Sequence, residues 1–202
     1  MQCRKRTFPF AVMAAVTLAL ALGGYTGAAD AKAGVKFPPG KLLHLKQVVE
    51  RYDANGNAVP QYLELWLTKD AGRCVELDAQ GNALSVALDA GRGHIFYDTA
   101  TLKAVRQEES AVFTVGFKAM QAAYPRQTAA NGGEYAGRDC MLYLLENAED
   151  WVKLYVDRST GYVLLCDAPT FRLKTALIEE TALDAALFEA PEGLVFEEGD
   201  RE

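Results

Sequence analysis

The chain has 202 residues, of which 50% are hydrophobic, and its 27 acidic and 21 basic side chains give a formal net charge of −6. A chain of this length predicts one domain with a sizeable core. Because acidic side chains are in excess and no basic stripe is present, the composition argues against nucleic acid and anionic lipid surfaces as main partners.

The first element is an apolar segment close to the N-terminus. Three basic residues at 4–6 precede an uncharged run that is apolar over 8–22, and an A-x-A pattern follows at 29–31. The apolar core of about 15 residues is shorter than the roughly 20 that a spanning helix needs. This order predicts a secretory signal peptide over residues 1–31 and a single domain over 32–202. The alternative is an uncleaved signal that anchors the protein to the membrane.

The next segments alternate between apolar and polar residues. Segments 62–68, 73–78 and 83–89 each place their aliphatic side chains on one face, and turn-forming Gly and Asn residues separate them. This period of two predicts antiparallel strands joined by tight turns, a β-meander. Segment 42–52 also fits a helix, but the hairpin-like turn that follows it favours a strand.

One stretch has a helical period instead. Phe113, Phe117, Met120 and Tyr124 recur at i, i+4, i+7 and i+11, which predicts one apolar helical face. Pro125 ends this helix.

The sequence after that helix contains two further elements. Segment 127–137 is rich in Ala, Asn and Gly, and we predict a flexible loop there. A short helical turn is predicted near 183–188, because Asp184 can cap its start and Pro191 stops it.

Segment 139–167 predicts three strands with turns near 147–150 and 158–161. If the first turn is symmetric, six apolar side chains of the first two strands share a face: Met141, Tyr143, Leu145, Val152, Leu154 and Val156. The opposite face is also largely apolar, whereas a one-sided antiparallel sheet has one polar face. Either both faces are covered, or one of them lines an apolar cavity. The helices predicted above are natural covers.

Three cysteines follow the predicted signal peptide: Cys74, Cys140 and Cys166. Their spacing matches no C-x-x-C motif. Cys140 and Cys166 fall on non-adjacent strands about 10 Å apart, and a disulfide needs Cα atoms within about 7 Å. No bond between these two is expected, and Cys74 reaches either one only if the sheet curls round. We predict that Cys166 is a small buried side chain.

Several of these segments resemble a known family. The order of "GRDC", "VDRSTGYVL" and "LDAALFEAPEGLVF" is similar to the outer-membrane lipoprotein carrier (LolA-like) family, which shares its fold with lipoprotein-sorting, sporulation and sigma-factor-regulator proteins. The resemblance covers roughly residues 62–196 and rests on two short signatures, Asp157…Thr160-Gly161 and Leu187-Phe188…Pro191-Glu192-Gly193. It implies a mainly β fold with a few helices (α+β), a curved, unclosed half-barrel with helices on its concave side, and an apolar hollow that accepts acyl chains.

The chain shows no pattern of a catalytic or metal site. Only His44 and His94 could act as bases at neutral pH, and no nucleophile, metal-ligand or phosphate-loop motif accompanies them. We therefore predict no enzyme, no catalytic residue, no metal and no cofactor.

The predicted function is that of an exported binding protein of the periplasm or extracytoplasmic envelope, holding a lipid, acyl chain or lipoprotein in its hollow. Membrane contact would be transient or made through an uncleaved signal. The predicted ligand-binding residues are the six strand residues above, with two helix residues as a lid: Met141, Tyr143, Leu145, Val152, Leu154, Val156, Phe117 and Met120. The alternative is an envelope protein-interaction or sensor domain of the same fold, with the hollow filled by its own helix.

Overall fold

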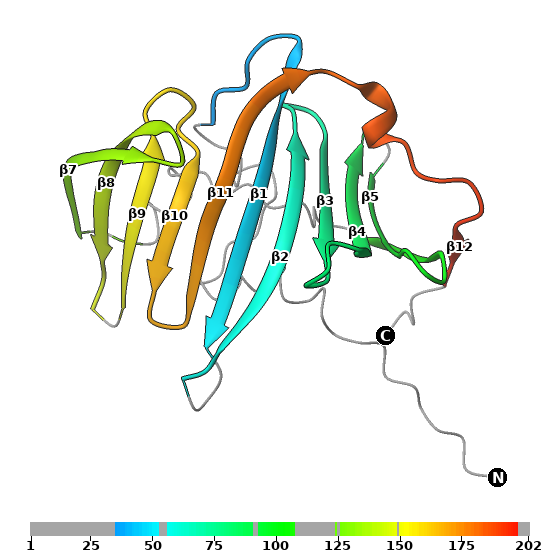
Figure 1. The fold of residues 1–202 in the computed structure, drawn as a ribbon, viewed down its shortest axis with the longest axis horizontal. Helices are drawn as coiled ribbons and strands as arrows, with labels where there is room; N and C mark the ends of the chain where they lie inside the picture. Colours follow the sequence, from blue (N-terminus) through cyan, green and yellow to red (C-terminus); the bar gives the residue numbers. More distant parts are fainter. Residues whose placement is uncertain are drawn as a thin grey trace.

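The computed structural model describes residues 35–52, 56–90, 93–107, 124, 126–148 and 150–197. These residues form one twelve-stranded sheet with the order β12-β6-β5-β4-β3-β2-β1-β11-β10-β9-β8-β7 (Figure 1). Neighbouring strands are antiparallel except for β12, which pairs with β6 in parallel. The sheet does not close, because β7 and β12 stand at its two ends. The predicted signal peptide lies outside the described residues.

The strands alternate with short turns along most of the chain. Their bounds are β1 Lys41–Tyr52, β2 Ala58–Leu67, β3 Gly72–Leu77, β4 Ala83–Ala90, β5 Gly93–Asp98, β6 Lys103–Gln107, β7 Arg126–Tyr135, β8 Arg138–Glu146, β9 Trp151–Asp157, β10 Val163–Ala168, β11 Phe171–Ala182 and β12 Val195–Phe196. A 3-10 turn, η1, spans Ala185–Phe188. No helix among the described residues is long and apolar enough to cross a membrane.

The period of two in the sequence sets the two sides of the sheet. In β2, Leu63, Leu65 and Leu67 are buried while Glu64 and Trp66 between them are half-buried. The same alternation continues in β1, which is a strand as predicted and not a helix. The predicted meander is therefore confirmed for this half of the sheet.

The predicted register of the β8–β9 hairpin is also confirmed. Met141 lies opposite Val156, Tyr143 opposite Leu154, and Leu145 opposite Val152. The turn between the strands is closed by Asn147 and Asp150, since the Asn147 N–H donates to the Asp150 carbonyl at 3.0 Å. The six side chains therefore share one face.

Strand β10, which follows the β9–β10 turn, contains a shift in register. The register shifts between Val163 and Leu165, so that one extra residue is accommodated in β10. Cys166 then lies opposite Leu154. This places Cys166 on the same face as the six apolar residues of β8 and β9.

The prediction of a flexible loop over residues 127–137 is wrong. Residues Arg126–Tyr135 form β7, which pairs along its length with β8. The hairpin closes through a two-residue turn in which Ala136 and Gly137 both have positive φ, 51° and 72°, the backbone that a tight β-turn requires. Small and glycine residues have low β-propensity, but the neighbouring apolar strand provides the hydrogen bonds that fix this one.

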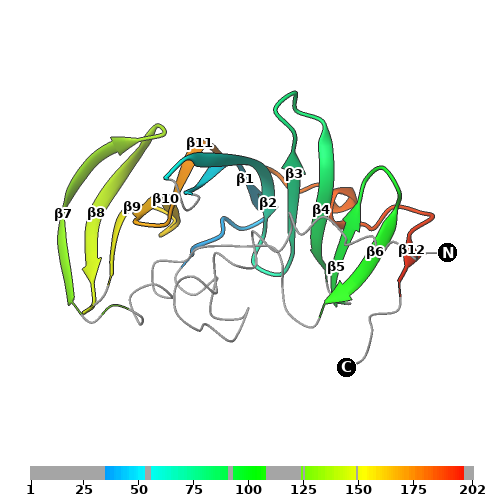
Figure 2. The same ribbon diagram turned by 90° about the horizontal axis from the view of Figure 1, so that it is seen from below.

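The sheet is curved, and its two faces differ. Figure 2 shows an arch, with the segment that precedes β1 on its inner side. Val35 and Phe37 of that segment pack on the main hydrophobic cluster, which contains Leu45, Leu65 and Cys74. We call the face that carries this cluster the concave face. The open, curved, mainly β half-barrel that was predicted is confirmed.

The opposite, convex face carries a smaller apolar cluster around Val75, Val86 and Tyr97. The turn η1 lies on this side, since the side chain of Arg73, which alternates with Cys74 in β3, donates to the carbonyl of Leu187 at 3.0 Å. The predicted helical turn and its cap are confirmed, because the Asp184 side chain accepts from the Ala186 N–H. Its place is on the convex face, however, and not in the hollow.

Candidate functional site

The concave face of the central strands carries the larger of the two hydrophobic clusters among the described residues. Register links it across neighbouring strands: Leu154 lies opposite Cys166, Cys166 opposite Leu173, and Leu173 opposite Val49. All four are at most 3% exposed. The face continues through the buried leucines of β1 and β2. Side chains from five neighbouring strands, β2, β1, β11, β10 and β9, therefore form one continuous apolar floor.

The structure brings the six predicted strand residues together on this floor. Leu145, Val152 and Leu154 have no exposed surface, and Val156 is 5% exposed. The other two, Met141 and Tyr143, lie on the outer strand β8 and are half-buried. In this conformation the floor is covered by the chain itself. The predicted lid residues Phe117 and Met120 lie outside the described residues.

Tyr124, the last residue of the predicted helical face, is within the described part of the chain. It is 3% exposed and belongs to the same cluster as Leu145 and Leu154. Its hydroxyl donates to Asp150 Oδ2 at 3.5 Å, and burial raises its pKa to about 12. Tyr124 is therefore one described piece of the cover over the concave face.

Three buried polar side chains form a hydrogen-bonded cluster within this apolar floor. The Gln47 side-chain amide donates to the Thr175 hydroxyl at 3.0 Å and to the Tyr162 hydroxyl at 3.4 Å. All three residues are at most 4% exposed, and burial raises the pKa of Tyr162. Buried polar groups need such partners, because an unsatisfied one costs about 1–3 kcal/mol. This group stabilises the junction of β1, β11 and the β9–β10 turn.

Arg51 is a concave-face residue that the sequence reasoning missed. It lies near the end of β1 and opposite the buried Phe171 of β11. Its Nε is buried and has no hydrogen-bond acceptor among the described residues, and burial lowers its pKa. The signal in the sequence was its place in β1, because alternation puts Arg51 on the side of Leu45 and Val49. The guanidinium can donate hydrogen bonds to an anionic or carbonyl group at this end of the concave face.

The three cysteines are separate thiols, and each is buried. Cys140 and Cys166 are at most 1% exposed and Cys74 is 6% exposed. Burial raises the pKa of all three and brings that of Cys74 to about 12. Only a thiolate is a good nucleophile or metal ligand. The prediction that Cys166 is a packing residue is therefore confirmed.

This burial predicts that the three thiols resist labelling. In native buffer at pH 8, a thiol reagent should leave Cys74, Cys140 and Cys166 unmodified, and denaturant should expose all three, as read by peptide mass mapping. Because their folded pKa values lie above the ordinary value of about 8.5, the folded protein holds more protons than the unfolded chain above that pH. The free energy of unfolding should therefore decrease as pH rises above about 8.5. Rapid native labelling of Cys166 would contradict this packing.

The two described histidines do not form a joint site. His44, on the convex face, lies between two carboxylates, with Glu179 Oε1 2.8 Å from Nδ1 and Glu64 Oε1 2.7 Å from Nε2. His94 lies on the other, concave face, where its Nδ1 is 2.8 Å from Asp89 Oδ1. Within the described ranges, no three His, Cys, Asp or Glu side chains gather as a metal site. Both histidines lie within hydrogen-bond distance of carboxylates.

Comparison with known proteins gives a fold and no family. No family model matches this sequence, and no curated protein matches it either. The crystal structure of MucB matches with a TM-score of 0.55 at 15% identity, over 89% of this chain and 64% of MucB. The Pseudomonas aeruginosa MucA/MucB complex matches with a TM-score of 0.51 at 15% identity, over 87% of this chain and 60% of that one. This chain thus spans less than two thirds of the matched MucB.

Two further solved structures have similar folds. An uncharacterised conserved protein from Thermus thermophilus matches with a TM-score of 0.52 at 8% identity, over 90% of this chain and 97% of its own. A LolA superfamily protein from Nitrosomonas europaea matches with a TM-score of 0.40 at 9% identity, over 85% of this chain and 97% of its own. The class defined here is an open, curved antiparallel sheet. The open, curved half-barrel that the LolA-like resemblance implies is the fold observed here.

Proposed function

We propose that this chain is an exported, non-enzymatic binding protein whose concave face holds an acyl chain or the lipid-modified part of a lipoprotein. The observation that supports this most is the continuous apolar floor across neighbouring strands, with Arg51 at one end, whose buried Nε has no acceptor in the part of the chain that the structure describes. Apolar surfaces with a few placed polar groups are the usual makeup of ligand sites. The N-terminal pattern over residues 1–31 supports export to the envelope.

Binding on this floor requires a change from the conformation described. Leu145, Val152 and Leu154 have no exposed surface, so an acyl chain reaches them only after the covering segments move outward. The half-buried Met141 and Tyr143 would then be the first residues that the ligand meets. Phe117 and Met120 keep their proposed role as a lid.

A second candidate is a protein-interaction or sensor domain of the same fold. The closed concave floor favours it, because a hollow filled by the chain itself needs no ligand for stability. MucB, whose fold is similar, is found in a complex with MucA. In this alternative an envelope protein is the partner, and exposed side chains such as Trp151, which is 40% exposed, provide contacts.

Two neighbouring residues give a matched test of the concave site. Met141 and Leu142 are both half-buried in β8 but point to opposite faces, because they are consecutive in a strand. A charge at Met141 should weaken binding of a fluorescent fatty acid by at least about tenfold, since a carboxylate would have to be desolvated beside the acyl chain. The measurement is a fluorescence titration of Met141→Asp and Leu142→Asp, each checked by circular dichroism.

The comparison of the two variants decides between the candidates. Loss of binding in Met141→Asp with retention in Leu142→Asp supports a ligand on the concave face. Equal binding by both folded variants would place the fatty acid elsewhere. If the unmodified protein fails to bind the fatty acid at all, the protein-interaction candidate takes precedence.

A further inference from the structure

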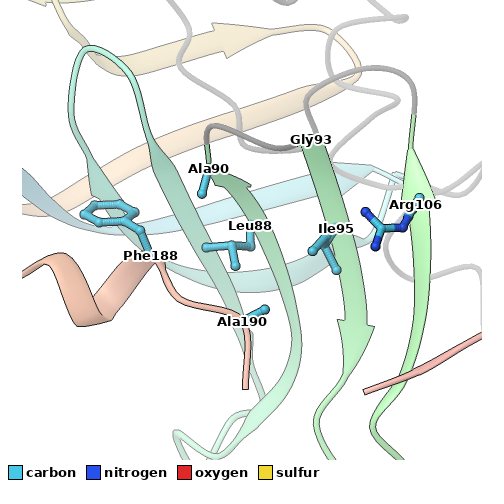
Figure 3. Close-up of a pocket in the computed structure, with 7 residues that line it drawn as sticks. All are labelled: Leu88, Ala90, Gly93, Ile95, Arg106, Phe188 and Ala190. Atoms are coloured by element: carbon cyan, nitrogen blue, oxygen red, sulfur yellow. The ribbon is translucent and has the colours of Figure 1, made fainter. Parts of the chain in front are cut away.

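An apolar hollow lies on the convex face, on the other side of the sheet from the proposed acyl site. It has a volume of about 300 Å³, which is at the lower end for small-molecule sites. Figure 3 shows Leu88 and Ile95 on its floor, Phe188 and Ala190 at its wall, and Arg106 at its side. None of its described lining residues is acidic. The hollow is therefore apolar with one cationic group.

The hollow exists because the C-terminal strap, residues 183–197, crosses the convex face and is anchored at two separated points. At η1, Arg73 donates to the Leu187 carbonyl at 3.0 Å. At β12, the Val195 N–H donates to the Leu102 carbonyl at 2.9 Å. Phe188 and Ala190 lie between these anchors and face β4 and β5 across the hollow.

The rim of this hollow on β5 is also open. Gly93 lines it, and a Cβ built there would meet no atom within 4 Å. This part of the rim is therefore open space.

Arg106 supplies the cation at the side of the hollow. Its guanidinium carbon lies over the Phe196 ring, 4.5 Å from the ring centre. The N–H donors of a guanidinium point outward in its plane, and among the described residues those of Arg106 donate to no acceptor. A carboxylate approaching in that plane could accept two parallel hydrogen bonds from the guanidinium.

We propose that this convex hollow binds a small amphiphilic carboxylate, with its apolar body between the sheet and the strap and its carboxylate on Arg106. Charge complementarity favours this occupant, because the described lining residues present one cation and no anion in an apolar surrounding. The site is independent of the concave floor, since the two lie on opposite faces of the sheet. If this convex site proved absent, the proposal of acyl binding on the concave floor would therefore stand unchanged.

The test is isothermal titration of the full chain with decanoate and with the uncharged decanol. Arg106→Gln should weaken decanoate binding by about tenfold through loss of the charge-assisted hydrogen bonds, and decanol should bind equally to both proteins. Ala190→Leu should weaken both ligands, because it fills the hollow from the strap. Arg126→Gln, an exposed arginine at the other end of the sheet, is the matched control and should leave binding unchanged.

Two further variants separate this site from the others. Because decanoate also suits the acyl site proposed on the concave floor, the Arg106→Gln comparison is repeated in the Met141→Asp background, where that site is weakened and the convex site is intact. Ala90→Leu fills the hollow from β4 and should reproduce the effect of Ala190→Leu. The proposal is overturned if, in the Met141→Asp background, Arg106→Gln leaves decanoate binding unchanged. It is also overturned if decanoate binding is lost in Met141→Asp but kept in both hollow-filling variants, because the ligand then lies on the concave face.

Discussion

Replacement of Leu154 by alanine should lower the free energy of unfolding by about 2–5 kcal/mol. Leu154 has no exposed surface and lies between Tyr143 of β8 and Cys166 of β10. Its loss removes apolar burial and leaves a cavity in a floor built from several strands. Urea denaturation followed by tryptophan fluorescence and circular dichroism measures the change.

The control for this prediction is another leucine in a strand. Leu84 lies in β4 and is 44% exposed, so Leu84→Ala should change the free energy of unfolding by less than about 0.5 kcal/mol. Equal effects of the two substitutions would show that Leu154 is not part of a packed concave core.

Replacement of Asp157 by alanine should lower the free energy of unfolding by about 2–4 kcal/mol, through the loss of hydrogen bonds in the β9–β10 turn. The Asp157 carboxylate is 1% exposed and accepts from the Ser159 N–H at 2.9 Å and from the Thr160 hydroxyl at 2.7 Å. Without it, the buried Thr160 hydroxyl loses its acceptor. Asp157→Asn, which keeps the shape and an acceptor oxygen, should lose less.

The matched control is the neighbouring strand's Asp139. Its side chain is 71% exposed and pairs with Arg158 Nε at 3.0 Å, and an exposed ion pair contributes at most about 1 kcal/mol. When both variants are unfolded in urea, Asp139→Ala should therefore lower the free energy of unfolding by at most about 1 kcal/mol. An Asp157→Ala protein as stable as Asp139→Ala would contradict the role given to this turn.

The short signature Asp157…Thr160-Gly161 in the sequence thus has a structural explanation. Asp157 organises the turn through Ser159 and Thr160, and Gly161 follows with a φ of 72°, which favours glycine. The signature fixes the register of β9 and β10 and supplies no catalytic group. This is why it indicates a fold and not an activity.

The strands of the central sheet could be predicted because their alternation is local and strong. Leu63, Leu65 and Leu67 reveal their shared face without any tertiary information, and the turn at 147–150 fixes the β8–β9 register. The shared face of the six proposed ligand residues followed from that register. Which face is concave depends on the curvature of the whole sheet, so it could not be read from one hairpin.

The elements that escaped prediction depend on partners far away in the sequence. β7 is a strand because β8 pairs with it, although Asn131, Gly132 and Gly133 indicate a loop by themselves. The convex hollow needs the contact between Arg73 and Leu187, which are 114 residues apart. Arg51 was overlooked for a different reason, since its face could have been inferred from Leu45 and Val49 in the same strand.

The most direct test of acyl binding on the concave face is native mass spectrometry of the full chain, purified from the cell envelope without detergent. We expect a mass above that of the polypeptide by the mass of a lipid or acyl species, which organic extraction removes and Met141→Asp diminishes. A bare polypeptide mass, together with failure to retain an added fatty acid, would contradict the proposed carrier function and direct attention to a protein partner.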